Sequence, residues 1–355
     1  MGVSIQIGRI FGIPLRLHIT FVILVGIIGI AGYFSGGPEK ALWSVVFIAA
    51  LFACVVLHEL GHSLVARAYG VRVESITLLP IGGVAAMEDI PRKPAEEALM
   101  AIAGPAVSLM LAGALYAVTE VLGYRGPIAY GGGPLLVMLL QTNLIIAMFN
   151  LLPAFPMDGG RVLRAVLAHY MDHVRATSIA VSLGQGLAVV MGLGALFIPG
   201  MSLWFVVIAF FIFVGAGQEG QQVRTQAVLE RVSAGQAMIR RFETLDRDAP
   251  LSVALAYATQ GYQHDFPVVD GDMIVGVVTR QDLLAGLHNL GPHHTVGQVM
   301  TTNVCQVPPQ ANMADVYRRI AQGGCNVVLV REGDRITGLV TPESFRDHLV
   351  ALSGR

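Results

Sequence analysis

The pattern of hydrophobic and polar positions divides the chain into two parts, and its character changes after residue 218. In the first part, long apolar stretches alternate with short segments that hold most of the charged residues. A helix needs about 20 apolar residues to cross the hydrocarbon core of a bilayer. The first part therefore predicts a multi-pass α-helical membrane domain with six spans, at His18–Tyr33, Ala41–Tyr69, Ala98–Val121, Leu135–Leu152, Thr177–Ile198 and Ser202–Val214.

The segment between the second and third spans, residues 71–86, has a mixed pattern that predicts short strands or a hairpin. An ordinary loop fits the same residues equally well. If the segment enters the membrane, its backbone must pair with protein or line a wet cavity, because lipid offers no hydrogen bonds. An exposed strand edge there could hold an extended peptide by strand addition.

The second part of the chain repeats itself with a constant offset of 62 positions. The matching residues are Gly235 and Gly297, Met238 and Met300, Gly276 and Gly338, and Thr279 and Thr341. An ungapped offset shared by this many residues predicts two copies of one soluble αβ unit, each with a helix opened by threonine. We expect a membrane domain at residues 1–220, a linker at 221–230, and repeats at 231–290 and 291–355.

Composition supports the membrane assignment and excludes some functions. Hydrophobic residues make up 54% of the chain and charged residues only 13%, whereas a soluble domain carries about 25% charged residues. The net charge of −1 and the lack of a basic run argue against nucleic-acid binding. Cys54, Cys305 and Cys325 are widely spaced without a C-x-x-C pattern, which favours reduced thiols over a disulfide framework.

The basic residues predict the orientation in the cell membrane. Six spans place both termini on one side. Ten basic residues then fall on that side, namely Arg9, Arg16, Arg67, Arg72, Arg92, Lys93, Arg161, Arg164, Arg175 and Arg224. Only Lys40 and Arg125 fall on the other. Since positively charged loops stay in the cytoplasm, both termini and the repeats are predicted to be cytoplasmic.

The second span contains the motif His58-Glu59-Leu60-Gly61-His62, which reads H-E-x-x-H. Residues four apart face the same side of a helix, so His58 and His62 can hold one metal ion. Glu59 stands beside them and can take a proton from a metal-bound water. The alternative is a pair of helix histidines satisfied by hydrogen bonds. Ionisable groups inside a membrane are costly and usually functional, which favours the metal site.

The fourth span ends in a broken helix that supplies a carboxylate. Asn150 is followed by Pro153, Pro156 and Asp158, and two prolines cannot both stay in a regular helix. Asp158 would complete a His-His-Asp zinc site with an open position. The alternative role of Asp158 is to cap the helix that follows it. A second histidine pair, at positions 169 and 173, lacks the adjacent glutamate and is expected to lie on a solvated helix face.

The two motifs, in this order on separate predicted spans, resemble the site-2 protease family of intramembrane zinc metalloproteases. The resemblance covers roughly residues 1–220. It implies Zn²⁺ bound by His58, His62 and Asp158, with Glu59 as the catalytic acid and base. It also implies that Asn150 steadies the substrate carbonyl or the developing oxyanion.

Residues from about 230 to 350 resemble a tandem pair of CBS domains, which often bind adenine nucleotides between the repeats. In the motif Gly276-Val277-Val278-Thr279-Arg280-Gln281-Asp282, the resemblance implies that Asp282 holds the ribose hydroxyls and Thr279 the phosphate. Ser344 replaces the aspartate in the second copy, which weakens the case for a second nucleotide site. Helix capping is the alternative role of Thr279 and Asp282. The resemblance also allows a homodimer through the CBS domains.

The function predicted from these patterns is hydrolysis of a peptide bond in or near a transmembrane segment of another protein, with possible regulation by an adenine nucleotide. The rival prediction is a CBS-gated membrane ion transporter, in which His58, His62 and Asp158 form an ion path. Glu59 separates the two, because a proton acceptor beside the metal is needed for hydrolysis and not for transport.

Overall fold

A computed structural model gives the structure of the chain. It describes residues 4–87, 93–124, 134–198, 203–260, 263–271, 273–321, 325–333, 335–342 and 344. Two of the basic residues that predict the orientation, Arg92 and Arg125, lie outside these ranges. The chain forms two compact units, Met1–Val223 and Arg224–Arg355.

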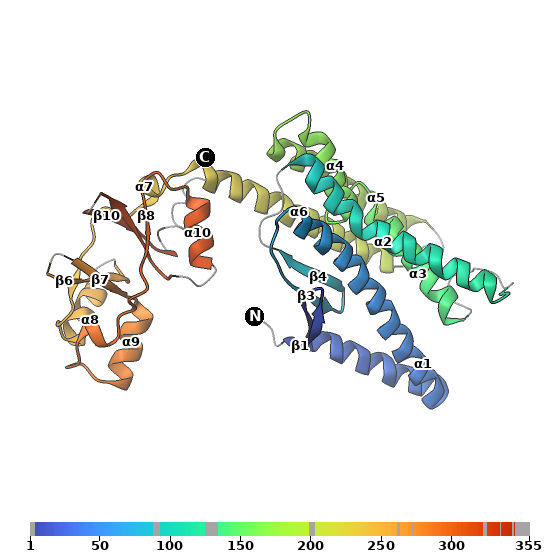
Figure 1. Cartoon of the computed structure of the whole chain (residues 1–355), viewed down its shortest axis with the longest axis horizontal. Coiled ribbons are helices and arrows are strands. Elements are labelled where there is room, and N and C mark those ends of the chain that lie inside the picture. The colour runs from blue at the N-terminus through green and yellow to red at the C-terminus, as the bar shows by residue number, and fades with distance from the viewer. Residues whose placement is uncertain are drawn as a thin grey trace. The chain divides into compact units, whose positions relative to one another are not determined.

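Unit 1 is built mainly from helices (Figure 1). They are α1 (Ile19–Ala68), α2 (Pro94–Val121), α3 (Leu135–Asn150), α4 (Asp158–Ala168), α5 (His173–Phe197) and α6 (Trp204–Arg231), the last of which continues into unit 2. In the described part of the chain, four helices are long and apolar enough to cross a membrane, namely α1, α2, α5 and α6. The residues expected as a linker, 221–230, are helical.

Helix α1 combines the first two expected spans and is sharply bent between them (Figure 1). The bend lies at Gly36 and Gly37, whose backbone angles are not helical. Gly37 has φ of 75° and ψ of −169°, a region that is essentially restricted to glycine. Pro38 follows in the first turn of the second arm, where a missing amide hydrogen costs nothing. The Gly-Gly-Pro sequence therefore fixes the position of the bend.

Two further segments differ from the expected pattern. Helix α3 has 16 residues, fewer than the roughly 20 that a bilayer span needs, so six crossings remain a prediction. The polar residues of the segment 161–175 predict that it lies in water, but most of it forms α4 and the start of α5, and Arg164 is only 3% exposed. An arginine reads as a surface residue in sequence, whereas here its charge is neutralised inside the bundle by residues from other helices.

A four-stranded sheet completes unit 1, with strands in the order β1 (Ser4–Ile10), β2 (Ile13–His18), β3 (Val73–Leu79) and β4 (Gly82–Met87). β2 and β3 are parallel, and the other pairs are antiparallel. The expected hairpin is thus part of a larger sheet, and β1 and β2 were missed. Phe11 and Gly12 form their two-residue turn with positive φ at both positions, as a tight hairpin requires.

The sheet packs against α1 through an apolar cluster. Phe21, Phe52 and Val56 of α1 and Leu78 of β3 are buried together, and the two phenyl rings meet edge to face at 4.4 Å. The side chain of His18 accepts a hydrogen bond from the amide of Thr20 and so caps α1. This packing holds strands β3 and β4 beside the half of α1 that carries the H-E-x-x-H motif.

Unit 2 contains two αβ repeats of the same topology, which confirms the internal repeat. The elements are α7 (Ala234–Ala237), β5 (Leu245–Asp246), α8 (Leu251–Gln260), β6 (Phe266–Asp270), β7 (Met273–Val278), α9 (Arg280–Asn289), η1 (Val296–Gln298), β8 (Cys305–Val307), α10 (Met313–Ala321), β9 (Val328–Glu332) and β10 (Arg335–Val340). In each sheet, β5-β6-β7 or β8-β9-β10, the first pair is parallel and the second antiparallel.

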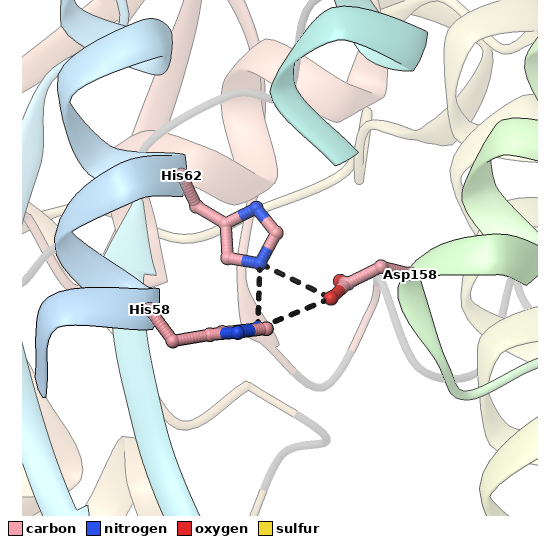
Figure 2. A group of neighbouring side chains, drawn as sticks. All are labelled: His58, His62 and Asp158. Carbon is pink, nitrogen blue, oxygen red and sulfur yellow. Dashed lines mark hydrogen bonds and ion pairs between the residues drawn. The ribbon is translucent and has the colours of Figure 1, made fainter. Parts of the chain in front are cut away.

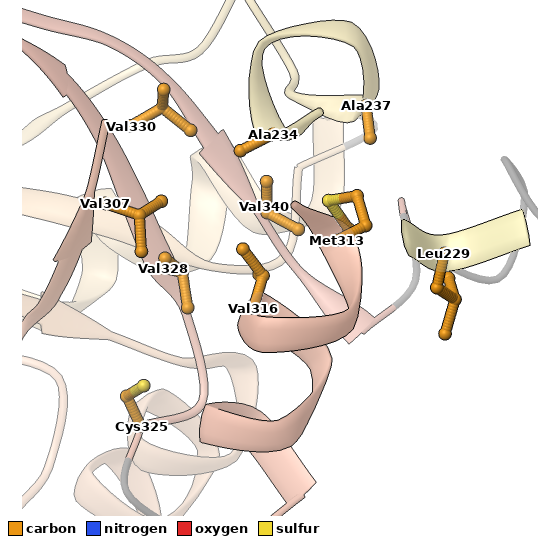
Figure 3. Packing of buried hydrophobic residues seen from close by; sticks show 10 residues of the cluster. All are labelled: Leu229, Ala234, Ala237, Val307, Met313, Val316, Cys325, Val328, Val330 and Val340. Carbon is orange, nitrogen blue, oxygen red and sulfur yellow. The ribbon is translucent and has the colours of Figure 1, made fainter. Parts of the chain in front are cut away.

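The second repeat is built around valine side chains from all three of its strands, with Met313 and Val316 of α10 packed over them (Figure 3). Cys325 lies at the edge of this cluster and is bonded to Cys305, with 5.9 Å between the Cα atoms. The prediction of three reduced thiols was therefore wrong for these two, and Cys54 is free. The cysteines are 20 residues apart in sequence, but parallel pairing of β8 with β9 brings them together.

Candidate metal centre

Helix α1 and the start of α4 bring three potential metal ligands together (Figure 2). His58 and His62 lie one turn apart on α1, and their Nε2 atoms are 3.2 Å apart. Oδ2 of Asp158 lies 3.1 Å from Nε2 of His62 and 3.4 Å from Nε2 of His58. Among the described residues, these three are the one group of His, Cys, Asp or Glu arranged to hold a metal ion.

The triangle of donor atoms has the size that a tetrahedral zinc site requires. Zinc binds imidazole nitrogen and carboxylate oxygen at about 2.0–2.2 Å, so two ligand atoms at the tetrahedral angle are ~3.3 Å apart. The three observed separations of 3.1, 3.2 and 3.4 Å match this value. Three protein ligands leave the fourth position open for water or substrate, as in catalytic zinc sites.

Helix α2 orients both imidazole rings through their other nitrogen. Nδ1 of His62 donates to the carbonyl oxygen of Met100 at 2.7 Å, which leaves Nε2 with its lone pair directed at the site. Nδ1 of His58 lies 2.9 Å from the hydroxyl of Ser108, which is fully buried. These partners fix the ring orientations, an arrangement typical of histidine ligands in metal sites.

Gly104 of α2 provides the space for the centre. A Cβ atom at this position would lie 2.1 Å from Nε2 of His62 and 2.6 Å from Nε2 of His58. Such distances are far inside van der Waals contact, so any side chain there would collide with the ligand atoms themselves. Because position 104 has no side chain, α2 can pack directly against the imidazole rings of the two histidines.

Asp158 is the first residue of α4, but its carboxylate does not cap the helix. The cap residue is Met157, and the carboxylate is directed at the histidines instead. Oδ2 of Asp158 therefore joins the two Nε2 atoms as the third potential metal ligand.

Glu59 is half-buried and lies next to the edge strand β4. A Cβ atom on Gly83 would come within 2.6 Å of Cγ of Glu59 and 3.1 Å of the side chain of Val55. The strand thus passes over the glutamate at a distance that only glycine permits. This contact places the outer strand of the sheet, as the described residues define it, beside the predicted proton acceptor.

The other predicted site residues lie outside the ligand cluster. Asn150 is half-buried at the last position of α3. The second histidine pair takes no part in the cluster, and Nε2 of His173 lies 3.8 Å from the carboxylate of Glu97 instead. Sequence reasoning missed Ser108 and Met100, although a serine in an apolar helix was an available signal for the first. No sequence signal marks Met100, because its backbone carbonyl makes the contact.

In unit 2, a pocket of about 690 Å³ lies between the repeats and has Thr279 in its lining. Further lining residues are His264, Asp265, Arg280, His288 and Asn326. The carboxylate of Asp282 accepts from the amide of Thr279 at 3.0 Å and from its hydroxyl at 2.7 Å, so the two residues cap α9. In this structure the pair therefore has the helix-capping role, which is the alternative to nucleotide binding.

Family models match both parts of the chain. The model for peptidase family M50 matches residues 46–131 and 126–193, a region that contains His58, His62 and Asp158. The CBS domain model matches residues 234–289 and 296–351. The second match agrees with the two repeats of unit 2.

Two relatives are similar over almost the whole chain. A zinc metalloprotease of Methanocaldococcus jannaschii is 36% identical over 343 residues, which cover 96% of this chain and 94% of the relative. Rip3 of Mycobacterium tuberculosis is 31% identical, with 96% of this chain and 91% of the relative covered. The solved structure of the site-2 protease from M. jannaschii is 44% identical and covers 61% of this chain and 95% of that one, at a TM-score of 0.46. The chain therefore belongs to peptidase family M50, the site-2 proteases, and is a zinc metalloprotease that carries a pair of CBS domains.

Proposed function

We propose that this chain hydrolyses a peptide bond in or near a transmembrane segment of another membrane protein. His58, His62 and Asp158 are the proposed zinc ligands. The observation that carries the proposal is the triangle of their donor atoms, which has tetrahedral dimensions and combines α1 with α4. The two histidines lie on α1 and their hydrogen-bond partners on α2, and both helices are long and apolar enough to cross a membrane.

Glu59 is the proposed catalytic acid and base. Bound zinc would polarise the substrate carbonyl and lower the pKa of a coordinated water from 15.7 to about 7. With zinc bound, the carboxylate of Glu59 would accept the proton of the attacking water and deliver it to the leaving amine. The adjacent position of Glu59 and His58 on α1 keeps the proton acceptor beside the ligand cluster through both steps.

The edge strand β4 is the proposed platform for the substrate. A transmembrane helix must unwind to expose a peptide bond, and the unwound backbone can pair with the outer strand of a sheet. β4 is the outer strand of its sheet, and Gly83 brings it against Glu59. Asn150 is proposed to donate a hydrogen bond to the substrate carbonyl as negative charge develops on its oxygen.

The test of this function is a comparison of metal content and cleavage. Glu59→Gln should keep stoichiometric zinc and lower the cleavage rate of a model single-span substrate by about 10²–10⁴-fold, because only the proton transfer is lost. Glu120→Gln, an exposed glutamate on α2, is the matched control and should behave as wild type. Unchanged cleavage by Glu59→Gln would refute the assignment, and ion flux that persists in this variant would favour the transporter.

We also propose that the pocket of unit 2 binds an adenine nucleotide. Arg280, His264 and His288 offer positive charge or hydrogen-bond donors, and Thr279 offers a hydroxyl. Asp282 would have to leave its capping interactions to bind ribose. Titration calorimetry of the full chain with AMP and with ATP tests this. Thr279→Val should weaken binding, whereas Thr259→Val, a control on α8, should not.

The orientation and assembly are proposals of the same kind. The excess of basic residues on one predicted side favours cytoplasmic termini and CBS domains. Labelling of single cysteines introduced near each terminus, in intact and permeabilised cells, would distinguish the two orientations. Light scattering of the purified chain in detergent would test the proposed homodimer.

A further inference from the structure

Arg164 of α4 lies at the centre of a buried ionic cluster that the metal site does not use. Its side chain is 3% exposed. Nε donates to Oε1 of Glu97 in α2 at 2.7 Å, and Nη1 donates to Oε1 of Glu219 in α6 at 3.0 Å. The other oxygen of Glu97 lies 3.8 Å from Nε2 of His173 in α5. One guanidinium therefore connects α4 to α2 and α6, and Glu97 extends the cluster to α5.

The same guanidinium contacts the loop that leads to Asp158. Its carbon Cζ lies 4.9 Å from the ring centroid of Phe155, a distance typical of a cation–π contact. Phe155 is fully buried and packs with Ala180 and Ala216 of the neighbouring helices. Because Phe155 precedes Asp158 by only three residues, Arg164 holds the loop before the carboxylate as well as the helix after it.

Helix α2 links this cluster to the metal centre. Met100 and Ser108 of α2 orient the two histidines, and Glu97, one turn before Met100, binds Arg164. The histidines and the helix of Asp158 are thus positioned by one and the same helix. An arginine suits this task, because its planar fork can serve two carboxylates and stack on a ring, which a lysine cannot do at once.

We propose that Arg164 is a positioning residue for the metal ligand Asp158. Its bonds to Glu97 and Glu219 and its contact with Phe155 fix the start of α4, so that the carboxylate meets both histidines at the separation that zinc requires. This inference rests on the proposed role of Asp158 as a ligand. It assigns no contact between Arg164 and the substrate or the metal.

The experiment measures metal binding rather than activity. The full chain is purified in detergent, freed of metal and titrated with Zn²⁺ against a chromophoric chelator, and the visible spectrum of its Co²⁺ form is recorded. Arg164→Lys keeps the charge but loses the fork, and should weaken Zn²⁺ binding by about 10–100-fold and shift the Co²⁺ bands, with helix content unchanged. Arg175→Lys, an exposed arginine of α5, is the matched control and should change neither.

Glu219→Leu provides a second variant that removes one partner and leaves the buried Arg164–Glu97 pair intact, so it decides the question if Arg164→Lys does not fold. It should also weaken Zn²⁺ binding and shift the Co²⁺ spectrum. Wild-type affinity and spectrum in a folded variant, even at reduced thermal stability, would overturn the proposal. Asp158→Ala is run in parallel. If it too keeps wild-type affinity, the proposed ligand set fails, whereas loss of binding in Asp158→Ala alone refutes only the role of Arg164.

Discussion

At the scale of single residues, position 104 is among the most constrained near the metal centre, because only glycine fits there. Gly104→Ala should abolish Zn²⁺ binding, because the new Cβ would lie 2.1 Å from Nε2 of His62. The measurement is zinc content after dialysis, by atomic emission. Gly113→Ala on the same helix is the control, since nothing lies within 4 Å of its Cβ. Equal zinc in the two variants would show that α2 can move away from the histidines.

Substitution of Ser108 should lower the Zn²⁺ affinity less than substitution of Gly104. Ser108→Ala removes the partner of Nδ1 of His58 and should lower Zn²⁺ affinity about tenfold, the lower end of the range for such outer partners. Ser108→Thr retains the hydroxyl and should recover part of the loss. Competition with a chelator gives both values. An unchanged affinity in Ser108→Ala would mean that the ring of His58 is held by packing alone.

The sequence predicts the residues of the metal centre, but not the contacts from α2 that hold the two histidines in place. His58, Glu59 and His62 share a short motif with fixed helical spacing, so their proximity follows from the helix alone. Asp158 could be added because it was the one carboxylate in a broken helix. The contacts from Gly104, Met100 and Ser108 depend on how α2 crosses α1, and that crossing is determined by tertiary packing.

At the scale of elements, β4 lies so close to α1 that a substitution in β4 should lower the cleavage rate while zinc stays bound. Gly83→Ala should displace the side chain of Glu59, whose Cγ would be 2.6 Å from the new methyl group. We expect cleavage to fall at least tenfold while zinc stays bound, because the ligand triangle is untouched. Gly186→Ala on α5, with open space around it, is the control. Loss of zinc in Gly83→Ala would contradict this division of roles.

Elements were predictable where one chemical pattern dominates. The long apolar helices follow from composition, and the repeat in unit 2 follows from its offset. β1 is absent from the predicted elements, because only Ile5 and Ile7 alternate with polar or small residues before Arg9 ends the pattern. The local pattern of α4 predicts a polar segment in water, since the ionic partners of Arg164 come from distant helices that such a pattern does not include.

At the scale of the whole molecule, the disulfide of unit 2 stands against the proposed orientation. Disulfides rarely persist in the reducing cytoplasm, whereas positive loops predict cytoplasmic CBS domains. Maleimide labelling under denaturing conditions should find one free thiol per chain, Cys54, if the Cys305–Cys325 bond forms in cells. Three labelled thiols before any reductant is added would show that both cysteines stay reduced there.

The same bond should contribute to the stability of unit 2. Closing a loop of 20 residues stabilises a fold by roughly 3 kcal/mol through the entropy of the unfolded chain. Cys305→Ser should therefore lower the free energy of unfolding of unit 2 by about that amount. Urea unfolding of the full chain, with and without reductant, gives the comparison. Reductant should have no further effect on the variant.

The ligand triangle has one more consequence, which concerns the lifetime of the protein rather than its chemistry. Its donors are up to 100 positions apart along the chain, on α1 and α4, so a bound ion links two segments that are distant in sequence. At a free concentration 100 times its Kd, such an ion stabilises the folded state by about 2.7 kcal/mol. A cell short of zinc would therefore lose molecules of this protease to unfolding and degradation, in addition to losing turnover.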